Sequence, residues 1–515
     1  MSERKPLALV IDFGTQSIRV GAVDLEGNIV ALIKRPYAPV YVSAAPGLAE
    51  QDANFYWGRF IECAKEFSKN HSNLYKDVIG MSLTSFRDTA VLLDKDLKPI
   101  RPCIHWLDQR LAEAARETMP IWKRALFKLV GMENTLIFNR RKTVALWYQQ
   151  NEPLNWAKTY RYVNISTYIH YKLTGNLTDS PSGFTGHYPI NYRTGEWYKN
   201  YSALKNIFDI PRTLMPDLAK PGTKIGCTTR EVFELTGIPE GIPFFVGGAD
   251  KSCECLGLGS VEPHVGSISY GTACSINVVN TKYHEPEPFL PAYPSVLEGF
   301  YNMEVQIYRG YWMLSWFIQE FAQEESSIAA IQHLVVEEVL NRKLEQIPPG
   351  CNGLVLQPFW GAGLRRPLAR GSIIGFNDGH TKMHLYRAIL EGIAFALRDG
   401  LEGMEKSQHK KVSELRISGG GSQSDVICQI TADIFGRPVS RVQTFETSTL
   451  GVAISTFIAA GYFKGPTEAI EAMSKKSITF TPNPEAREKY EYLYRKVYKK
   501  MYAKLKPMFT DIKDY

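Results

Sequence analysis

The sequence lacks the features that mark membrane, disulfide-rich and nucleic-acid-binding proteins. Its 515 residues include only eight scattered cysteines, and 60 basic side chains nearly balance 53 acidic ones, for a net charge of +7. No segment approaches the roughly 18 uninterrupted apolar residues of a membrane span, and the first apolar run stops at Asp12. We therefore expect a cytoplasmic protein with reduced cysteines and with neither a membrane nor a nucleic acid as partner.

A zinc site is not indicated either. Cys253-Glu254-Cys255 brings two thiols together, but no further ligands follow at a recognisable spacing. Low-complexity segments are also lacking. A chain of this length with 44% hydrophobic and 22% charged residues is typical of two globular domains of roughly 250 residues each.

The N-terminal segment predicts a β-hairpin with a polar turn. An apolar run from Leu7 to Asp12 leads into Gly14-Thr15-Gln16-Ser17, and a second apolar run follows from Ile18 to Val23. A glycine, consecutive N–H groups and two hydroxyls can approach phosphate oxygens, and Asp12 could hold a hydrated Mg²⁺ beside them. The alternative is an ordinary hairpin whose turn is merely polar.

A second segment repeats this design. Residues 267–279 read as a strand, the turn Gly271-Thr272 with small polar residues to Ser275, and another strand. Two such hairpins, one early in each half, suggest two related lobes that hold a nucleotide.

Polar residues also gather at predicted strand ends in the first half. We expect a helix opening at Asp52, then strands at Val78–Leu83 and Ala90–Leu93 as a second hairpin-like pair. Arg87 and Asp88 lie between these strands, and Trp106 and Asp108 follow them. An Arg fork, carboxylates and an indole face suit a polyhydroxylated ligand, although surface ion pairs and one buried tryptophan would give the same pattern.

Asp250 is the candidate general base. The buried strand at Ile242–Val246 delivers Gly247-Gly248-Ala249-Asp250 into a helix of small residues. Two glycines clear space, and an acid at the mouth of a strand can accept a proton from a substrate hydroxyl. The structural alternative is an N-cap for the helix that follows.

The C-terminal half contains the clearest long helix, at Lys382–Glu405. The strand Leu415–Ser418, Gly419-Gly420-Gly421 and a helix to Phe435 follow, an arrangement that lets backbone press against a flat ligand; the spacing is neither Rossmann nor Walker. The last helix, Glu485–Lys506, is basic and aromatic. A membrane or nucleic-acid surface is conceivable, but we favour docking on its own domain with lysines in solvent.

Taken in order, these motifs resemble the FGGY carbohydrate kinases of the sugar kinase, actin and Hsp70 superfamily. The two hairpins, Trp106-x-Asp108-x-Arg110, the Gly-x-x-Asp at Asp250 and Gly436-Arg437-Pro438 all match the family. The resemblance implies an α/β fold of two actin-like (ribonuclease H-like) domains with an active-site cleft between them. We place an N-terminal FGGY domain at 1–262 and a C-terminal one at 263–515.

The resemblance also implies ATP-dependent phosphorylation of a primary hydroxyl on a small sugar or polyol. Asp250 would be the catalytic base, and Asp12 would hold Mg²⁺ through water. The substrate would be bound by Arg87, Asp88, Trp106, Asp108 and Asp250. ATP would be bound by Gly14, Thr15, Gln16, Ser17, Arg19, Gly271, Thr272, Gly420, Gly421 and Ser424.

Several departures from the family leave the substrate open. Lys251 replaces a usual Gln and Tyr311 a usual Gly, and Ile137 stands where glycerol kinases have a tyrosine. Arg87-Asp88 resembles the Arg-Glu pair of glycerol kinases and differs from the Met-His of xylulokinases. We favour a ketopentose such as xylulose or ribulose, with glycerol or another polyol, or a non-catalytic ATP-binding sensor, as alternatives. The sequence does not determine the oligomeric state, so a homodimer stays open.

Overall fold

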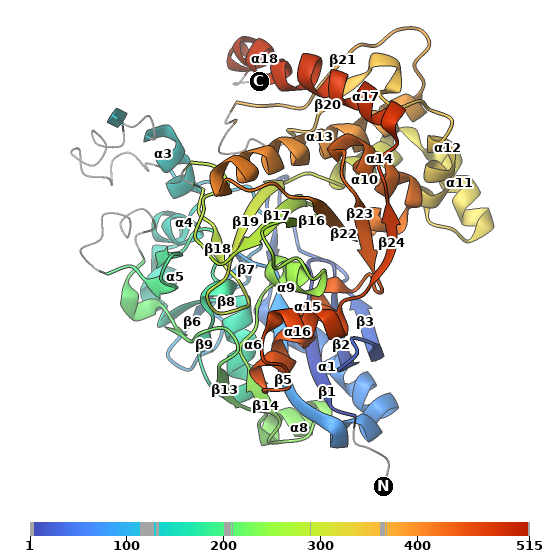
Figure 1. Cartoon of the computed structure of the whole chain (residues 1–515). Coiled ribbons are helices and arrows are strands. Elements are labelled where there is room, and N and C mark those ends of the chain that lie inside the picture. Colours follow the sequence, from blue (N-terminus) through green and yellow to red (C-terminus); the bar gives the residue numbers. More distant parts are fainter. Residues whose placement is uncertain are drawn as a thin grey trace. The chain divides into compact units, whose positions relative to one another are not determined.

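A computed structural model of the chain (Figure 1) describes residues 5–113, 128–129, 133–199, 208, 210–288, 290–360, 366 and 368–512. The chain divides into two compact units. Unit 1 comprises Met1–Gly259, Tyr293–Phe300 and Glu446–Ser474, and unit 2 comprises Ser260–Ala292, Tyr301–Phe445 and Lys475–Tyr515. The division of the sequence at residue 262 lies close to the first crossing, but unit 1 also takes in two later segments.

Unit 1 is built on a mixed sheet with the strand order β13-β14-β5-β1-β2-β3, in which β15 also pairs with β5. Strand β1 is antiparallel to β2 and parallel to β5. The predicted hairpin is confirmed, because β1 and β2 pair along their length, and the apolar side chains of both strands are buried. The strands are β1 (Leu7–Phe13), β2 (Ser17–Asp24), β3 (Ile29–Pro36), β5 (Val78–Ser85), β13 (Lys224–Cys227), β14 (Pro243–Phe245) and β15 (Gly248–Ala249).

Helices pack around this sheet and carry its core residues. The predicted helix at Asp52 is confirmed: the Asp52 side chain accepts a hydrogen bond from Asn54 N, which caps the orphan donors of the first turn. The helices of unit 1 are α1 (Ala53–His71), α3 (Glu133–Lys142), α4 (Val144–Asn151), α5 (Pro153–Lys158), α6 (Ile165–Thr174), α8 (Arg230–Thr236), α9 (Asp250–Gly257), α15 (Thr447–Ala459) and α16 (Pro466–Met473).

One predicted pairing in unit 1 is wrong. Strand β6 (Ala90–Leu93) does not form a hairpin with β5; it pairs antiparallel with β8 (Arg161–Asn164). The paired residues of β6 and β8 are about 70 positions apart in the sequence, so local patterning does not reveal this pairing. The remaining short elements of unit 1 are β4 (Glu50–Gln51), η1 (Ser72–Asp77), β7 (Cys103–Ile104), β9 (Thr178–Asp179), η2 (Pro181–Gly183), β10 (Ile190–Asn191), β11 (Glu196–Trp197), η3 (Arg212–Leu214), β12 (Asp217–Leu218) and β18 (Tyr293–Pro294).

Unit 2 repeats the sheet design of unit 1. Its strand order is β19-β17-β16-β22-β23-β24, with β16 antiparallel to β17 and parallel to β22. The second predicted hairpin is therefore confirmed, and it occupies the same place in its sheet as β1 and β2 do in theirs. The strands of unit 2 are β16 (Val265–Tyr270), β17 (Cys274–Asn280), β19 (Tyr301–Ile307), β20 (Val355–Gln357), β21 (Ser372–Ile374), β22 (Glu414–Gly419), β23 (Val439–Val442) and β24 (Lys476–Phe480).

The long helix α13 runs through the core of unit 2, as its apolar periodicity predicts. It spans Lys382–Gln408 and buries Leu397 and Leu401 among others. The other helical elements of unit 2 are α10 (Trp312–Phe321), α11 (Gln323–Gln332), α12 (Val336–Leu344), η4 (Cys351–Gly353), η5 (Gly420–Gln423), α14 (Asp425–Phe435), α17 (Pro484–Leu493), the π-helical turn η6 (Tyr494–Tyr498) and α18 (Lys499–Asp511).

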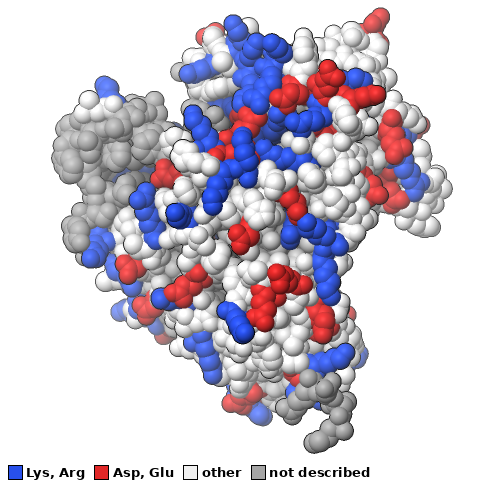
Figure 2. Space-filling model, viewed as in Figure 1, with Lys and Arg blue, Asp and Glu red and all other residues white. Residues whose placement is uncertain are grey.

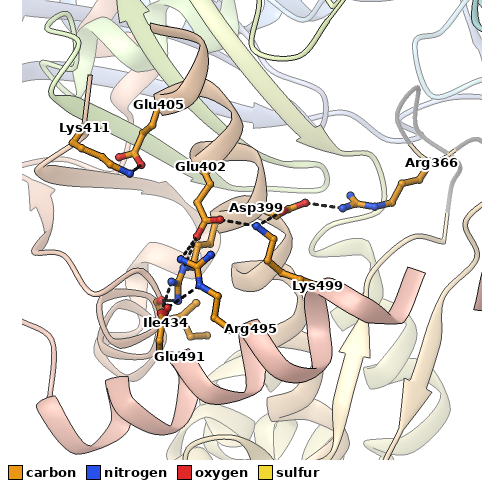
Figure 3. Close-up of polar contacts among 10 residues, drawn as sticks. Arg366, Asp399, Glu402, Glu405, Lys411, Ile434, Glu491, Arg495 and Lys499 are labelled. Carbon is orange, nitrogen blue, oxygen red and sulfur yellow. Dashed lines mark hydrogen bonds and ion pairs between the residues drawn. The ribbon is translucent and has the colours of Figure 1, made fainter. Parts of the chain in front are cut away.

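Ion pairs fix the C-terminal helices on α13 (Figure 3). Lys499 Nζ lies 2.7 Å from Glu402 Oε2 and 3.4 Å from Asp399 Oδ1, and Arg495 lies 3.2 Å from Glu402 Oε1. Tyr494 and Tyr498 are buried beneath these pairs. The docking of the terminal helix on its own domain is thus confirmed. Figure 2 shows basic side chains gathered over α17 and α18 with acidic ones among them, and exposed positions include Lys496, Lys500 and Lys504.

The cysteines and the helix lengths can be read directly from the structure. All eight cysteines lie in the described ranges and are free thiols. Within these ranges, no helix is both long and apolar enough to cross a bilayer.

Candidate active site

The first hairpin of unit 1 places a carboxylate and a guanidinium group next to each other. Asp12 near the end of β1 and Arg19 in β2 are cross-strand partners, and Arg19 Nη1 lies 3.6 Å from Asp12 Oδ2. Gly14 N donates to Ser17 O at 3.1 Å and closes the turn. A side chain at Gly14 would crowd the Arg19 guanidinium, since its Cβ would lie 3.1 Å from Nη1. The glycine therefore leaves room for the arginine, and its turn presents Thr15 and Gln16.

Asp12 is an electrostatically costly carboxylate. It is 4% exposed, and burial raises its pKa to about 6, against the attraction of Arg19; the nearby charges of Glu446 and Asp250 add to the rise. A divalent cation would relieve this cost, and hard cations prefer carboxylate oxygen. Among the described residues, no three His, Cys, Asp or Glu side chains form a cluster that could hold a metal. A single buried carboxylate is compatible with a Mg²⁺ that keeps most of its waters, and this role of Asp12 stays a prediction.

Asp250 begins the helix α9 at the end of the sheet. The short strand β15 pairs with β5, and a side chain at Gly247 would overlap the Leu83 carbonyl while one at Gly248 would overlap Ser182. Both glycines are therefore needed for this close approach. The predicted alternative of an Asp250 N-cap is wrong, because Ala249 is the N-cap and Asp250 is the first helical residue.

The surroundings of Asp250 suit a proton acceptor. Burial raises its pKa, while Lys251 and Arg87 oppose the rise. A carboxylate with a raised pKa is a stronger base, and nearby cations favour its ionised form. Lys251 Nζ itself lies 2.7 Å from Glu254 Oε2 on the same helix.

Arg87 and Asp88 lie next to each other in a strained turn. Asp88 has a φ of 55°, and its Oδ2 lies 2.8 Å from His187 Nδ1. Burial opposes ionisation of Asp88, but His187 outweighs it and the pKa is lowered. The Arg87 guanidinium lies 5.6 Å from the centre of the Tyr293 ring. His187 and Tyr293 are neighbours that the sequence analysis missed, because they come from a bend and from the short strand β18, both far along the chain from Arg87.

The other two predicted substrate residues differ in their surroundings. The Trp106 Nε1–H is buried and has no hydrogen-bond partner among the described residues. Asp108 instead accepts hydrogen bonds from Ala49 N at 2.6 Å and from Arg110 Nη2 at 2.7 Å, and its side chain is 2% exposed. The Trp106 N–H is thus unpaired within the described residues, whereas Asp108 holds the surrounding loops. The contact of either residue with substrate stays a prediction.

The two segments of unit 2 that we predict to bind nucleotide meet at the carboxyl ends of two neighbouring strands. Tyr270 at the end of β16 pairs with Gly419 at the end of the parallel β22, so the turn Gly271-Thr272 and the glycine triplet are neighbours. Tyr311 N donates to Gly271 O at 3.2 Å. The carboxyl ends of parallel strands are where α/β folds bind ligands.

Within the triplet, Gly419 has a φ of 81° that favours glycine. A side chain at Gly421 would overlap the Tyr311 hydroxyl, whereas one at Gly420 would meet only Tyr270 O at 4.0 Å. Ser424 is the N-cap of α14 and its hydroxyl accepts a hydrogen bond from Ile427 N at 3.4 Å. The structure thus brings Asp12 within electrostatic reach of Arg19 and Asp250, and Asp250 within reach of Arg87, in unit 1, and the turn Gly271-Thr272 next to the glycine triplet in unit 2. The roles of all these residues stay predictions.

Solved structures with the same architecture are sugar kinases. The crystal structure of xylulose kinase from Rhodospirillum rubrum is 26% identical, with a TM-score of 0.80 over 97% of this chain and 99% of that one. Together with the repeated sheets, this likeness defines a sugar kinase fold of two actin-like domains, as the resemblance implied.

Sequence comparison then gives the family. Residues 7–257 match the N-terminal domain of the FGGY family of carbohydrate kinases, and residues 266–460 match its C-terminal domain. The chain belongs to the FGGY family of carbohydrate kinases and is a phosphotransferase. It is 30% identical to the xylulose kinase of Staphylococcus epidermidis strain ATCC 12228 over 516 residues, with 99% of each chain covered. It is also 28% identical to the autoinducer-2 kinase of Escherichia coli K12, over 95% of this chain and 93% of that one.

Proposed function

We propose that the protein transfers the γ-phosphoryl group of ATP to a primary hydroxyl of a small linear sugar, with a ketopentose such as xylulose or ribulose favoured. The observation that carries the proposal is the placement of Asp250, a carboxylate with a raised pKa beside Arg87 and within electrostatic reach of Asp12. Full-length similarity to a xylulose kinase supports the choice of sugar.

In this mechanism the protein chiefly positions its reactants. Asp250 accepts the proton of the attacking hydroxyl, while Arg87 and the Trp106 N–H orient the rest of the sugar. Mg²⁺ bound with ATP would neutralise phosphate charge, and Asp12 would hold it through water. Arg19, Thr15, Ser17 and Thr272 would hold phosphate oxygens. The glycines of the triplet, with Ser424, would border the adenosine.

A polyol kinase is the second candidate. The pairing of Arg87 with the neighbouring carboxylate Asp88 supports it, because a cation and an anion on adjacent residues can bind vicinal hydroxyls without a carbonyl group. His187 holds the Asp88 carboxylate at 2.8 Å, so the acid is already oriented. A panel that includes glycerol and pentitols distinguishes the two candidates.

The test is ADP release from MgATP across pentuloses, hexuloses, polyols and aldonates. We expect one compound to raise turnover, and Asp250→Asn to lower kcat for it by about 10²–10⁴-fold because the general base is lost. Asp425→Asn is the matched control, since that carboxylate is 70% exposed and pairs with Arg441; it should retain wild-type turnover. Equal turnover in Asp250→Asn and wild type would reject Asp250 as the base. If no compound in the panel raises turnover, the proposed phosphorylation of a small sugar or polyol is rejected.

A further inference from the structure

We propose that the first turn of helix α15 positions the metal and phosphate side of the site, with Thr449 orienting Asp12 and Glu446 orienting Arg19. The inference deepens the proposed function and rests on it. It gives a role to two residues that the sequence analysis did not assign to the site. Both residues act through another side chain and are therefore positioning residues.

Thr449 fixes one oxygen of the Asp12 carboxylate. Its Oγ1 donates to Asp12 Oδ2 at 3.2 Å, and both side chains are buried, at 1% and 4% exposure. Arg19 Nη1 approaches the same oxygen, at 3.6 Å. Both contacts that Asp12 makes with described side chains thus engage Oδ2. The rotation of the carboxylate is set, and Oδ1 is the oxygen turned away from these partners and presented to a hydrated cation.

Glu446 fixes the arginine from the same turn. Its Oε2 lies 2.5 Å from Arg19 Nε, and its Oε1 lies 2.9 Å from Lys34 Nζ. Arg19 and Lys34 are cross-strand partners in β2 and β3. One carboxylate thus spans two adjacent strands, which leaves the terminal nitrogens of Arg19 directed toward Asp12 and the turn at Gly14.

The first turn of α15 is itself held in place by close helix packing. Helix α15 packs against α9 so closely that a side chain at Gly451 would overlap Cys253 O, and one at Gly257 would overlap Thr447 O (Figure 1). Ser448 Oγ also donates to the backbone oxygen of Asp250 at 3.4 Å. The same turn therefore contacts the residues of both carboxylates that the mechanism uses, across 437 residues of sequence in the case of Asp12.

The test compares two threonines of one helix. Thr449→Val and Thr456→Val each remove a buried hydroxyl from α15. Thr456 Oγ1 donates to Val452 O within the helix, at 2.7 Å, instead of to Asp12. The readout is the affinity for Mn²⁺, a spectroscopic substitute for Mg²⁺, measured by electron paramagnetic resonance with ATP and no sugar. We expect Thr449→Val to weaken Mn²⁺ binding by about 10-fold, and Thr449→Ser to restore it.

Thr456→Val should bind Mn²⁺ like the wild type. Wild-type affinity in Thr449→Val, or an equal loss in both valine variants, would overturn the role of Thr449. For Glu446, the pair is Glu446→Gln and Lys34→Ala: the first should weaken ATP binding and the second should not. If Lys34→Ala has the same effect as Glu446→Gln, the pairing with Arg19 is not what matters.

The Mn²⁺-binding test can fail or succeed independently of the proposed function, because it is run without sugar. Mn²⁺ binding that depends on Thr449 in a protein without sugar turnover would support the positioning role and reject the transfer reaction. A wild-type protein that binds no Mn²⁺ with ATP would overturn the positioning role itself.

Discussion

His105 is a neutral, buried base next to the candidate substrate residue Trp106. Its side chain is 1% exposed, and burial lowers its pKa to about 4, against the opposing pull of Asp108. Its Nδ1 accepts a hydrogen bond from Leu107 N at 3.2 Å, and this bond needs the unprotonated nitrogen. The loop that carries Trp106 therefore depends on a histidine without charge.

Because the pKa of His105 is lowered in the folded protein, we predict that the free energy of unfolding decreases in mild acid. The unfolded chain binds the proton near pH 6.5, whereas the folded state resists it until about pH 4. The contribution of His105 is therefore complete above pH 6.5 and falls by about 3 kcal/mol as the pH drops to 4. Chemical unfolding of the full-length protein at several pH values, compared between wild type and His105→Gln, measures this contribution.

Glutamine keeps an acceptor but does not titrate. The difference in unfolding free energy between the two proteins should therefore change with pH between 6.5 and 4 and be constant above. His409→Gln is a suitable control, since His409 is an exposed residue at the end of α13. A pH-independent difference for His105→Gln would show that folding does not shift the pKa of this imidazole, and would contradict the prediction.

Residues that sequence patterning identifies are those whose chemistry is local. Asp12 and Gly14 belong to one hairpin, and Asp250 directly follows two glycines, so short windows predict their arrangement. Asp108 matches a motif as well as they do, yet Ala49 N and Arg110 occupy its oxygens. Thr449 could not be found this way, because its hydrogen bond to Asp12 joins segments that only the folded chain brings together.

Helices α9 and α15 show how a glycine in a helix can be required. Glycine in a helix interior costs about 1 kcal/mol relative to alanine, and propensity alone would therefore favour replacing Gly451. In the structure, Gly451 lies against the backbone of Cys253, and Gly257 lies against that of Thr447. Two glycines on facing helices thus permit a separation that no side chain would allow.

We expect opposite effects of alanine at two helical glycines of unit 1. Gly451→Ala should destabilise the protein by about 1–3 kcal/mol, because the methyl group must displace backbone. Gly58→Ala in α1 should stabilise it by up to about 1 kcal/mol, because a Cβ there meets no atom within 4 Å. Thermal unfolding of both variants checks the pair, and a Gly451→Ala protein as stable as wild type would contradict the close packing.

Elements with strong local signals were predictable, and their partners were not. The caps at Asp52 and Ser424 and the apolar stripe of α13 give helix limits to within a few residues. The sequence also reads the last helix as continuous, whereas a π-helical turn at Tyr494–Tyr498 interrupts it. That turn places Tyr494 and Tyr498 in the core beneath the ion pairs of α13, a tertiary demand that residue order does not reveal.

The path of the whole chain makes unit 1 depend on residues near its far end. After residue 259 the chain builds unit 2, returns at Tyr293–Phe300 and returns again at Glu446–Ser474. The second return supplies α15 and α16. Without α15, Asp12 loses Thr449, Arg19 loses Glu446, and the buried face of α9 loses its neighbour.

We therefore predict that residues 1–262 do not fold as an independent domain. A fragment of these residues should unfold without cooperativity and bind a dye for exposed apolar surface, because the core of unit 1 lacks its helix α15. The matched control joins residues 444–476 to this fragment through a flexible glycine-serine linker, which restores α15 and α16. Circular dichroism during heating measures the outcome: we expect a cooperative transition only in the linked protein. A cooperative transition in 1–262 alone would show that the sheet and its N-terminal helices suffice, and that α15 contributes to the site without being needed for the fold.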